Sequence, residues 1–331
     1  MFILINISRF FILFIFFFMI AFSNANSEET FNSWLKSYKK NALKKGISQE
    51  TLNLAFKNVK FLDQVIKYDR KQPEFFEDTI TYVSKRANLS RVNNAKKLLK
   101  KNKKLFYEIE NKFSVEKEIL LSLWGIETNF GKHVGKMDII SCLATLSFDK
   151  RRRDFFSSQL LILLQLIDNK LINPDVLYGS WAGAYGNFQF MPSTIKNYAI
   201  DYDGNNKIEL KKSLYDSAAS AANYINKIGW KKGEPCFYRV KLEKKINNKY
   251  INSSARNIEN RLKISKWKKK GIVSFDGSEI KSNLKAALIL PDGNENSPAY
   301  LVFQNYEKIL KWNRSLRFAI SVCTLSNKLK S

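Results

Sequence analysis

The chain has 331 residues, with 56 Lys or Arg against 30 Asp or Glu, so its formal net charge is +26. Its only histidine, His133, argues against a Ser/His/Asp hydrolase and against a histidine-rich metal site. The three cysteines are widely spaced and fit neither a disulfide framework nor a zinc pattern. Cys142 and Cys323 lie in apolar helical contexts, so we expect both to be core residues.

Residues 1–25 are typical of a secretory signal. Arg9 precedes an apolar run, and small residues up to Ala25 offer a cleavage point. The run is shorter than the roughly 20 residues of a membrane span, although an uncleaved N-terminal anchor remains an alternative. Since no Cys stands at the cleavage point, we expect an exported chain that is not a lipoprotein and has no permanent membrane span after cleavage.

The high charge comes mainly from Lys that is spread along the whole chain. Nucleic acid is the usual partner of a very basic protein. No basic cluster lies inside a recognisable nucleic-acid-binding motif, however, and an exported protein rarely meets nucleic acid. We therefore expect an anionic polymer of the cell envelope as the partner, and no nucleic acid.

Residues 28–113 show helical periodicity, with interruptions at Gly46 and Pro73. The next stretch, residues 114–131, predicts a single helix. Ser114 is the expected N-cap, and Gly131 is the expected left-handed residue that ends the helix. Apolar residues recur in this stretch at three- and four-residue steps, so they share one face.

Glu127 lies within the apolar arc of this helix rather than on its polar side. A buried carboxylate is costly unless it is paired, and burial raises the pKa of a carboxyl group. A carboxyl group that stays protonated near neutral pH serves well as a general acid. The helix alone leaves a second interpretation open, in which the glutamate simply pairs with a buried Arg or hydroxyl group.

A glycine-rich stretch follows at residues 178–199. Gly179, Gly183 and Gly186 favour a loop whose backbone passes close to another part of the chain. Ser180 and Gln189 add polar groups to this loop. Aromatic residues are interleaved with them, which argues against a flexible linker.

Residues 201–212 resemble a calcium-binding loop in spacing. Asp201, Asp203 and Asn205 occupy its positions 1, 3 and 5, whereas position 12 holds Lys212 instead of an acid. Asp216 is the only nearby acidic replacement. A structural calcium ion and a metal-free Asp/Asn-rich turn are both open, and no other cofactor is expected.

Residues 234–298 change character. Alternating and β-branched stretches, separated by Asp-Gly pairs, predict short strands and hairpin turns. The very basic segment KISKWKKK, residues 263–270, is expected to lie outside any core. A final amphipathic helix begins near residue 305, and Asn313 precedes its most apolar run, where capping is the simplest role. The whole chain is therefore expected to be mainly α with a small β subdomain.

These motifs together resemble the membrane-bound lytic transglycosylase B family, including its soluble members, which cleaves peptidoglycan. The resemblance rests on LWGIETNFGK, TLSFDKRRRDFF, GSWAGAYGNFQFMPSTIKNYAIDYDGN and WNRSLRFAISV. It implies a lysozyme-like helical catalytic body at residues 26–331, with the β-containing subdomain at about 234–298 and a C-terminal helix that returns to the active site. It also implies a periplasmic enzyme, a monomer, that acts on peptidoglycan glycan strands.

The resemblance assigns roles residue by residue. Glu127, in WGIET, matches the single catalytic acid/base. The expected substrate-binding positions are Ser180, Gln189, Asn313 and Tyr82, together with Trp312 and Phe318, which stand where the family usually has tyrosines. Members that bind calcium hold it at the positions of Asp201, Asp203, Asn205 and Asp216.

The implied reaction cleaves the β-1,4 bond between N-acetylmuramic acid and N-acetylglucosamine and leaves a 1,6-anhydromuramyl end, with no water consumed. Most glycosidases use two carboxyl groups, whereas the motifs here offer only Glu127. Two alternatives remain open: a lysozyme-type hydrolase on the same fold, which needs a positioned water, and a cell-wall-binding protein without catalytic activity.

Overall fold

The structure is a computed structural model that describes residues 30–71, 76–294 and 297–331. The expected signal segment, residues 1–25, lies outside the described residues. The chain divides into two compact units, residues 1–41 and residues 42–331. Everything that follows concerns the second unit, apart from helix α2.

Helix α2 (Phe31–Lys44) accounts for most of the described part of the first unit. The Trp34 ring lies between Phe31 and Tyr38, with centroid distances of 5.7 and 5.2 Å. These rings recur at three- and four-residue steps, so they form one aromatic face of the helix. Burial raises the pKa of Tyr38 well above its usual range.

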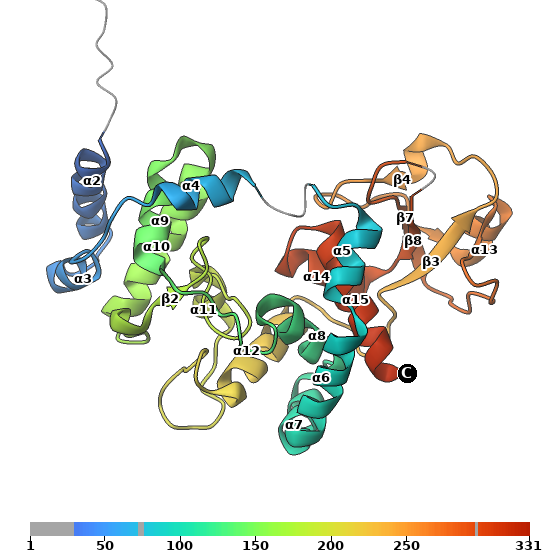
Figure 1. The fold of residues 1–331 in the computed structure, drawn as a ribbon, viewed down its shortest axis with the longest axis horizontal. Helices are drawn as coiled ribbons and strands as arrows, with labels where there is room; N and C mark the ends of the chain where they lie inside the picture. The colour runs from blue at the N-terminus through green and yellow to red at the C-terminus, as the bar shows by residue number, and fades with distance from the viewer. Residues whose placement is uncertain (1–29, 72–75, 295–296) are drawn as a thin grey trace, which may run out of the picture. The chain divides into compact units, whose positions relative to one another are not determined.

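The second unit is mainly helical (Figure 1). Its first helices are α3 (Gln49–Ala55), α4 (Asp63–Arg70), α5 (Thr79–Arg86), α6 (Leu89–Lys101) and α7 (Lys103–Phe113). The central helices are α8 (Lys117–Thr128), α9 (Ile139–Phe148), α10 (Arg153–Asp168), α11 (Pro192–Tyr198) and α12 (Leu214–Lys227). The last ones are α13 (Ile264–Lys269), α14 (Gln304–Trp312) and α15 (Leu316–Lys330). None of the helices in the described ranges combines the length and the apolar character needed to cross a membrane.

The core of the helical body is built around α8 and α15. Leu120, Leu121 and Leu123 of α8 are completely buried, so this helix is covered on more than one face. Helix α15 packs against α8 and also against α5, α6 and α14. The C-terminal helix is therefore packed into the helical body, whereas its expected return to the active site stays a prediction.

The start of α8 differs from the prediction. Ser114 has φ 52° and ends α7 in the left-handed conformation, and α8 begins only at Lys117 after the N-cap Glu116. Glu116 does not cap with its side chain, because its carboxylate accepts hydrogen bonds from Trp230 Nε1 at 2.6 Å and Gly233 N at 2.8 Å. The predicted helix was thus too long by one turn, since tertiary contacts fix its first residues.

The last predicted helix is two helices. Helix α14 ends at Trp312 and α15 begins at Leu316, with Asn313 in an extended conformation between them. The N-cap of α15 is Ser315, whose hydroxyl accepts a hydrogen bond from Phe318 N at 3.2 Å. Asn313 is therefore not the N-cap of α15, and its side chain is available for another role.

The strands form two sheets. A small antiparallel pair joins β1 (Met137–Asp138) to β2 (Tyr178–Gly179). The larger sheet has the order β4-β7-β8-β3-β6, with β5 paired to β7, and it is antiparallel except for the β4–β7 pair. Its strands are β3 (Phe237–Leu242), β4 (Ile251–Asn252), β5 (Leu262–Lys263), β6 (Ile272–Ser274), β7 (Lys285–Ile289) and β8 (Ala299–Val302). This sheet is the small β part of the predicted mainly helical fold, and we call it the β subdomain, although β8 lies beyond the expected bounds of residues 234–298.

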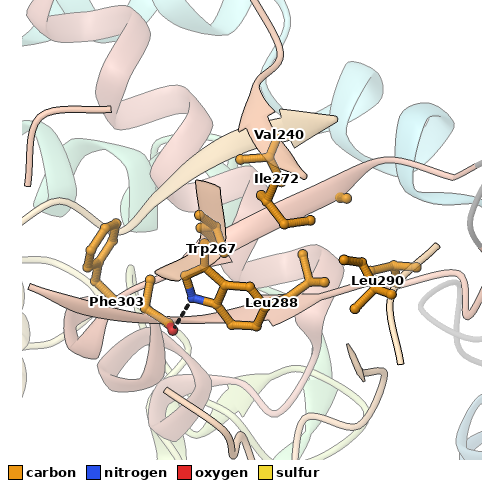
Figure 2. Packing of buried hydrophobic residues seen from close by; sticks show 10 residues of the cluster. Val240, Trp267, Ile272, Leu288, Leu290 and Phe303 are labelled. Atoms are coloured by element: carbon orange, nitrogen blue, oxygen red, sulfur yellow. Dashed lines mark hydrogen bonds between the residues drawn. The ribbon is translucent and has the colours of Figure 1, made fainter. Parts of the chain in front are cut away.

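The β subdomain has its own apolar core (Figure 2). Trp267 is completely buried among residues such as Leu288 and Phe303, and its indole N–H donates to the Ala286 carbonyl at 2.8 Å. The expectation that KISKWKKK lies outside the core was wrong for this residue. The Trp267 side chain anchors helix α13 in the core, while the lysines of this helix are exposed to solvent.

A disulfide bond joins Cys236, just before β3, to Cys323 of α15 across 87 residues. The prediction that Cys323 is a plain core residue was therefore wrong, because chain folding, not spacing, brings the two sulfurs together. Cys142 is the free, buried cysteine among the described residues. Burial, together with the charge of Asp138, raises the pKa of its thiol to about 12.

Candidate active site

Glu127 lies in the last turn of α8 and is partly exposed rather than fully buried. Its Oε1 accepts a hydrogen bond of 2.8 Å from Nε1 of Trp312, at the end of α14. An indole N–H therefore holds one carboxylate oxygen, while α8 supplies a rigid support. The simpler interpretation, a glutamate paired with a buried Arg or hydroxyl group, stays open.

The C-terminal end of α8 is hydrogen-bonded to the glycine-rich loop. The hydroxyl of Thr128 donates to the Asn187 carbonyl at 2.8 Å and accepts from Gly131 N at 2.9 Å. Asn129 and Phe130 both adopt positive φ, at 50° and 61°. The helix therefore ends at Thr128, and its left-handed C-cap is Asn129, two residues before the predicted Gly131. The contacts of Thr128 fix the position of Glu127 relative to the loop.

Ser180 begins a tight turn within that loop. Its backbone N–H donates to the Ala184 carbonyl at 2.9 Å, and its hydroxyl accepts from Ala184 N at 3.0 Å. Gly135, with φ 86°, lies close to strand β2, which directly precedes Ser180. A Cβ added to Gly135 would lie 2.1 Å from the Gly179 carbonyl oxygen. The loop is therefore a closely packed structure, as its interleaved aromatic residues predict, and not a flexible linker.

Gln189 lies at the tip of the same loop, in the left-handed conformation with φ 52°. Its amide nitrogen donates to the carbonyls of Gly186 at 3.0 Å and Val134 at 3.2 Å. These two bonds determine the orientation of the side-chain amide. Its oxygen, which has no hydrogen-bond donor among the described residues, is the atom left to accept from a ligand.

Trp312 connects this loop to α12 through a wall of aromatic rings. Its ring stacks on Tyr224 at 5.1 Å and lies 5.5 Å from Phe190, while Tyr224 stacks on Tyr198 at 4.4 Å. Burial raises the pKa of Tyr224 to about 12, so its phenol stays protonated and donates to the Lys311 carbonyl at 3.0 Å. Rings of this kind pack well against the apolar faces of sugars.

The sequence analysis did not single out Tyr198, Tyr224 or Phe190 as site residues. A signal was present, because Tyr215 and Tyr224 are the two large aromatic residues of a helix otherwise rich in Ala and Ser. Such a helix allows close packing, so a large ring on it marks a position where space is left. Only the structure shows that the Tyr224 ring faces Trp312.

Asn313 follows Trp312 directly and is partly exposed. Its backbone carbonyl accepts from Ser315 N at 2.8 Å, whereas its side-chain amide has no partner among the described residues. Both a donor and an acceptor are therefore available on the residue that follows Trp312. The role of Asn313 as an active-site amide stays a prediction.

Two predicted site residues are buried instead of lining the site. Tyr82 is 1% exposed, and the guanidinium carbon of Arg86 lies 3.4 Å from the centre of its ring. Phe318 is 3% exposed in the first turn of α15. Neither ring can stack on a sugar as it stands, so for both residues substrate contact stays a prediction.

The predicted calcium loop brings three carboxylates together. Oxygen atoms of Asp201, Asp203 and Asp216 lie within 4.8 Å of one another. Asp216 is completely buried and accepts from the backbone N–H groups of Tyr202 at 2.8 Å and Glu209 at 2.9 Å. All three ligands are hard oxygen donors, which fits Ca²⁺. The Asn205 amide oxygen accepts from Lys207 N at 2.9 Å, so its predicted role as a ligand stays a prediction.

Taken together, the site has one carboxyl group on a rigid helix, an indole donor on that carboxyl, a wall of rings and two amides with free capacity. Such a set suits a carbohydrate ligand and acid–base chemistry by a single group.

Comparisons with known proteins agree with this class of site. The family model "Transglycosylase SLT domain" matches residues 30–327. The chain therefore belongs to the SLT-domain transglycosylase family.

Individual relatives were found by sequence and by structure. Membrane-bound lytic murein transglycosylase B of Escherichia coli (strain K12) is 42% identical over 123 residues, which are 37% of this chain. That match spans only about a third, 34%, of the relative's own length. SltB3 from Pseudomonas aeruginosa, crystallised in complex with NAG-NAM-pentapeptide, is 31% identical with a TM-score of 0.82, covering 92% of this chain and 80% of SltB3.

Two further crystal structures bear on the ligands of this family. SltB3 was also crystallised in complex with NAG-anhNAM-pentapeptide. The lytic transglycosylase Slt35 of Escherichia coli, in complex with calcium, is 26% identical with a TM-score of 0.75, covering 89% of this chain and 92% of Slt35. These likenesses extend over most of the chain and agree with the predicted lysozyme-like helical fold.

Proposed function

We propose that this protein is a lytic murein transglycosylase. The observation that carries the proposal is the Glu127 carboxyl, held by Trp312 at the end of α8 in a chain of the SLT-domain family. The relatives' ligands support a substrate of alternating N-acetylglucosamine and N-acetylmuramic acid with peptide stems.

The proposed reaction uses Glu127 twice. The protonated carboxyl first donates its proton to the glycosidic oxygen, and the C1–O bond of N-acetylmuramic acid breaks. The positive charge that develops at C1 is shared with the substrate's own N-acetyl group, as in substrate-assisted exceptions to the two-carboxyl rule. Glu127, now ionised, takes the proton from the C6 hydroxyl, whose oxygen attacks C1 and closes the 1,6-anhydro ring.

We propose that Trp312 acts as a positioning residue through Glu127. Its indole N–H, which is a donor only, binds Glu127 Oε1 at 2.8 Å and so holds the carboxyl group in one orientation toward the substrate.

Three polar side chains orient the sugar in this proposal. The Gln189 amide oxygen accepts from a substrate N–H or hydroxyl, because its nitrogen is already bonded to backbone carbonyls. Asn313 and Ser180 hold ring hydroxyls or the N-acetyl group. Such positioning places the C6 hydroxyl near C1 and lowers the entropic cost of ring closure.

The test is digestion of purified sacculi by the mature chain, with released fragments weighed by mass spectrometry. We expect muropeptides that are lighter by one water than hydrolysis products. Glu127→Gln is expected to abolish release, whereas Glu108→Gln, on the exposed surface of α7, retains it. Reducing ends would favour the lysozyme-type alternative, and binding of sacculi without any release by the wild type would favour a non-catalytic wall protein.

We further propose that the chain is exported to the periplasm by residues 1–25 and works there as a monomer on the wall. The basic composition, the apolar N-terminal run and the wall-directed relatives support this location. Cell fractionation and mass determination of the mature N-terminus test it. A chain that stays cytoplasmic would contradict the proposal.

A further inference from the structure

The β subdomain presents an unusual amount of unpaired positive charge. Residues 237–285 contain fourteen Lys or Arg and four Asp or Glu. Among the described residues, the ion pair found for these basic groups is that of Arg261 with Glu307 of α14. The Asp276 carboxylate is occupied by its own turn, where Ser274 Oγ donates at 2.6 Å and Ser278 Oγ at 2.7 Å. The remaining lysines are therefore available to an external anion.

Helix α13 shows how this charge is displayed. Trp267 is the buried anchor of the helix (Figure 2), whereas Lys266, Lys268 and Lys269 are exposed. The subdomain core thus fixes the backbone from which these lysines extend. A charged group on a rigid backbone needs less ordering upon binding than one on a loop.

An open cavity of about 1040 Å³ lies beside this helix. Its walls come from α13, from β6 and from the segment 277–283. Lys268 and Lys281 contribute cationic groups, and Glu279 contributes the single acidic one. Hydroxyl and amide groups contribute most of the remaining polar lining, from Ser265, Ser274, Ser278, Ser282 and Asn283. The cavity is thus suited to a polar, negatively charged chain segment.

An exposed ring extends the cationic surface next to the cavity lining. Phe275 follows Ser274 and is 42% exposed, with the Arg239 guanidinium carbon 3.7 Å and Lys241 Nζ 4.8 Å from the centre of its ring. Two cations held against one exposed aromatic ring remain accessible to an anion from the solvent side.

We propose that this cavity and its lysines, Lys268 and Lys281, form a second wall-binding site that takes carboxylate-bearing peptide stems. The inference rests on the proposed function for the identity of the polymer, because peptidoglycan supplies both a chain and many carboxylates. The site holds the enzyme on the sacculus, while Glu127 acts on the glycan elsewhere on the molecule.

A hollow lined with hydroxyl groups favours a polymer over a lipid surface. Peripheral binding to a membrane relies on an apolar face that enters the interface. The lining here is more polar and recessed, so a flexible peptide can enter it and a bilayer cannot. Contacts between exposed charges are screened by salt over about 8 Å at physiological ionic strength, so binding is expected to weaken as salt increases.

The experiment measures the affinity of the full mature chain for purified sacculi by co-sedimentation at low salt. The test variant is Lys268→Glu/Lys281→Glu. The matched control is Lys96→Glu/Lys100→Glu on the exposed face of α6, which changes the net charge equally. We expect roughly a fivefold weaker affinity for the test variant, because each reversal replaces an attraction with a repulsion, and much less for the control.

Sacculi stripped of peptide stems by an amidase, and vesicles containing phosphatidylglycerol, complete the test. The wild type is expected to lose affinity for stripped sacculi, to the level of the test variant. An equal loss in both charge-reversal pairs, no loss in either, or undiminished binding to stripped sacculi would each overturn the inference. It would also be overturned if the test variant lost binding to vesicles alone.

The product assay keeps this inference separate from the proposed function. With short soluble glycan fragments as substrate, the test variant is expected to release anhydro products at the wild-type rate. A wild type that forms no anhydro product on any substrate would refute the proposed function, while co-sedimentation would still decide whether the lysines bind peptide stems.

Discussion

Replacement of Trp312 by Phe is the most informative change to the proposed acid–base group. The indole N–H donates to Glu127 Oε1 at 2.8 Å, and Phe removes this donor while keeping an aromatic ring against Tyr224 and Phe190. A donor hydrogen bond favours the ionised carboxylate over the acid. In the variant, Glu127 therefore stays protonated to a higher pH.

The size of the effect follows from the geometry of this bond. A hydrogen bond to a charged group contributes about 1.5–3 kcal/mol, and 1.36 kcal/mol corresponds to one pH unit. Because Glu127 is partly exposed and water can replace the lost donor, the lower end applies. Activity that needs a protonated acid declines on the alkaline side, so we expect this limb of the pH profile to move up by about one pH unit.

The assay is the release of anhydro-muropeptides from sacculi as a function of pH. Tyr224→Phe serves as the control, because it removes the phenol bonded to the Lys311 carbonyl in the same ring stack but leaves the donor to Glu127 in place. The reasoning is refuted by an alkaline limb that does not move in Trp312→Phe, or one that moves equally in Tyr224→Phe. Thermal unfolding of both variants checks that the fold is kept.

Three further predictions concern parts that support the site. Gly135→Ala is expected to lower both stability and activity, because the added Cβ would collide with the Gly179 carbonyl. Gly46→Ala is the control in a thermal melt, because Gly46 has nearly the same φ, 87°, but open space around it. Calcium is expected to raise the melting temperature of the wild type, since a ligand at a hundredfold excess over its Kd adds about 2.7 kcal/mol; Asp216→Asn should abolish this rise, and an unchanged rise would exclude the site. Reduction of the disulfide, or Cys236→Ser, is expected to cost about 2–4 kcal/mol in denaturant unfolding, and equal stability of the oxidised and reduced chains would contradict that.

Sequence reasoning placed Glu127 on a helix correctly but misjudged the ends of the helix. Ser114 has the residue type of an N-cap, yet it terminates the preceding helix with φ 52°. At the other end, Asn129 rather than Gly131 takes the terminal left-handed position. Helix ends depend on contacts with distant parts of the chain, here Trp230 on Glu116, and no local pattern records those contacts.

The same limit applies to the site. Glu127 stands out locally as a carboxyl group in an apolar arc, whereas Gln189 is one of several polar residues in a glycine-rich loop and is selected only by the family resemblance. The hydrogen bond between Trp312 and Glu127 joins residues 185 positions apart. The pairing of Cys236 with Cys323 is likewise nonlocal, and spacing alone argued against it. Only the folded chain reveals which neighbour a polar atom has.

Trp312 stands where the family resemblance predicts a tyrosine, and an indole offers Glu127 a different partner. A tyrosine hydroxyl both donates and accepts, so it can bind either the carboxylate or the protonated acid through the proton-bearing oxygen. An indole N–H only donates, so it favours the ionised carboxylate that takes up the second proton in the proposed reaction. Because Tyr224 stacks on the Trp312 ring and Phe190 of the glycine-rich loop lies against it, the donor is held in place, and the two proposed proton transfers share one geometry, as a single carboxyl group serving both steps requires.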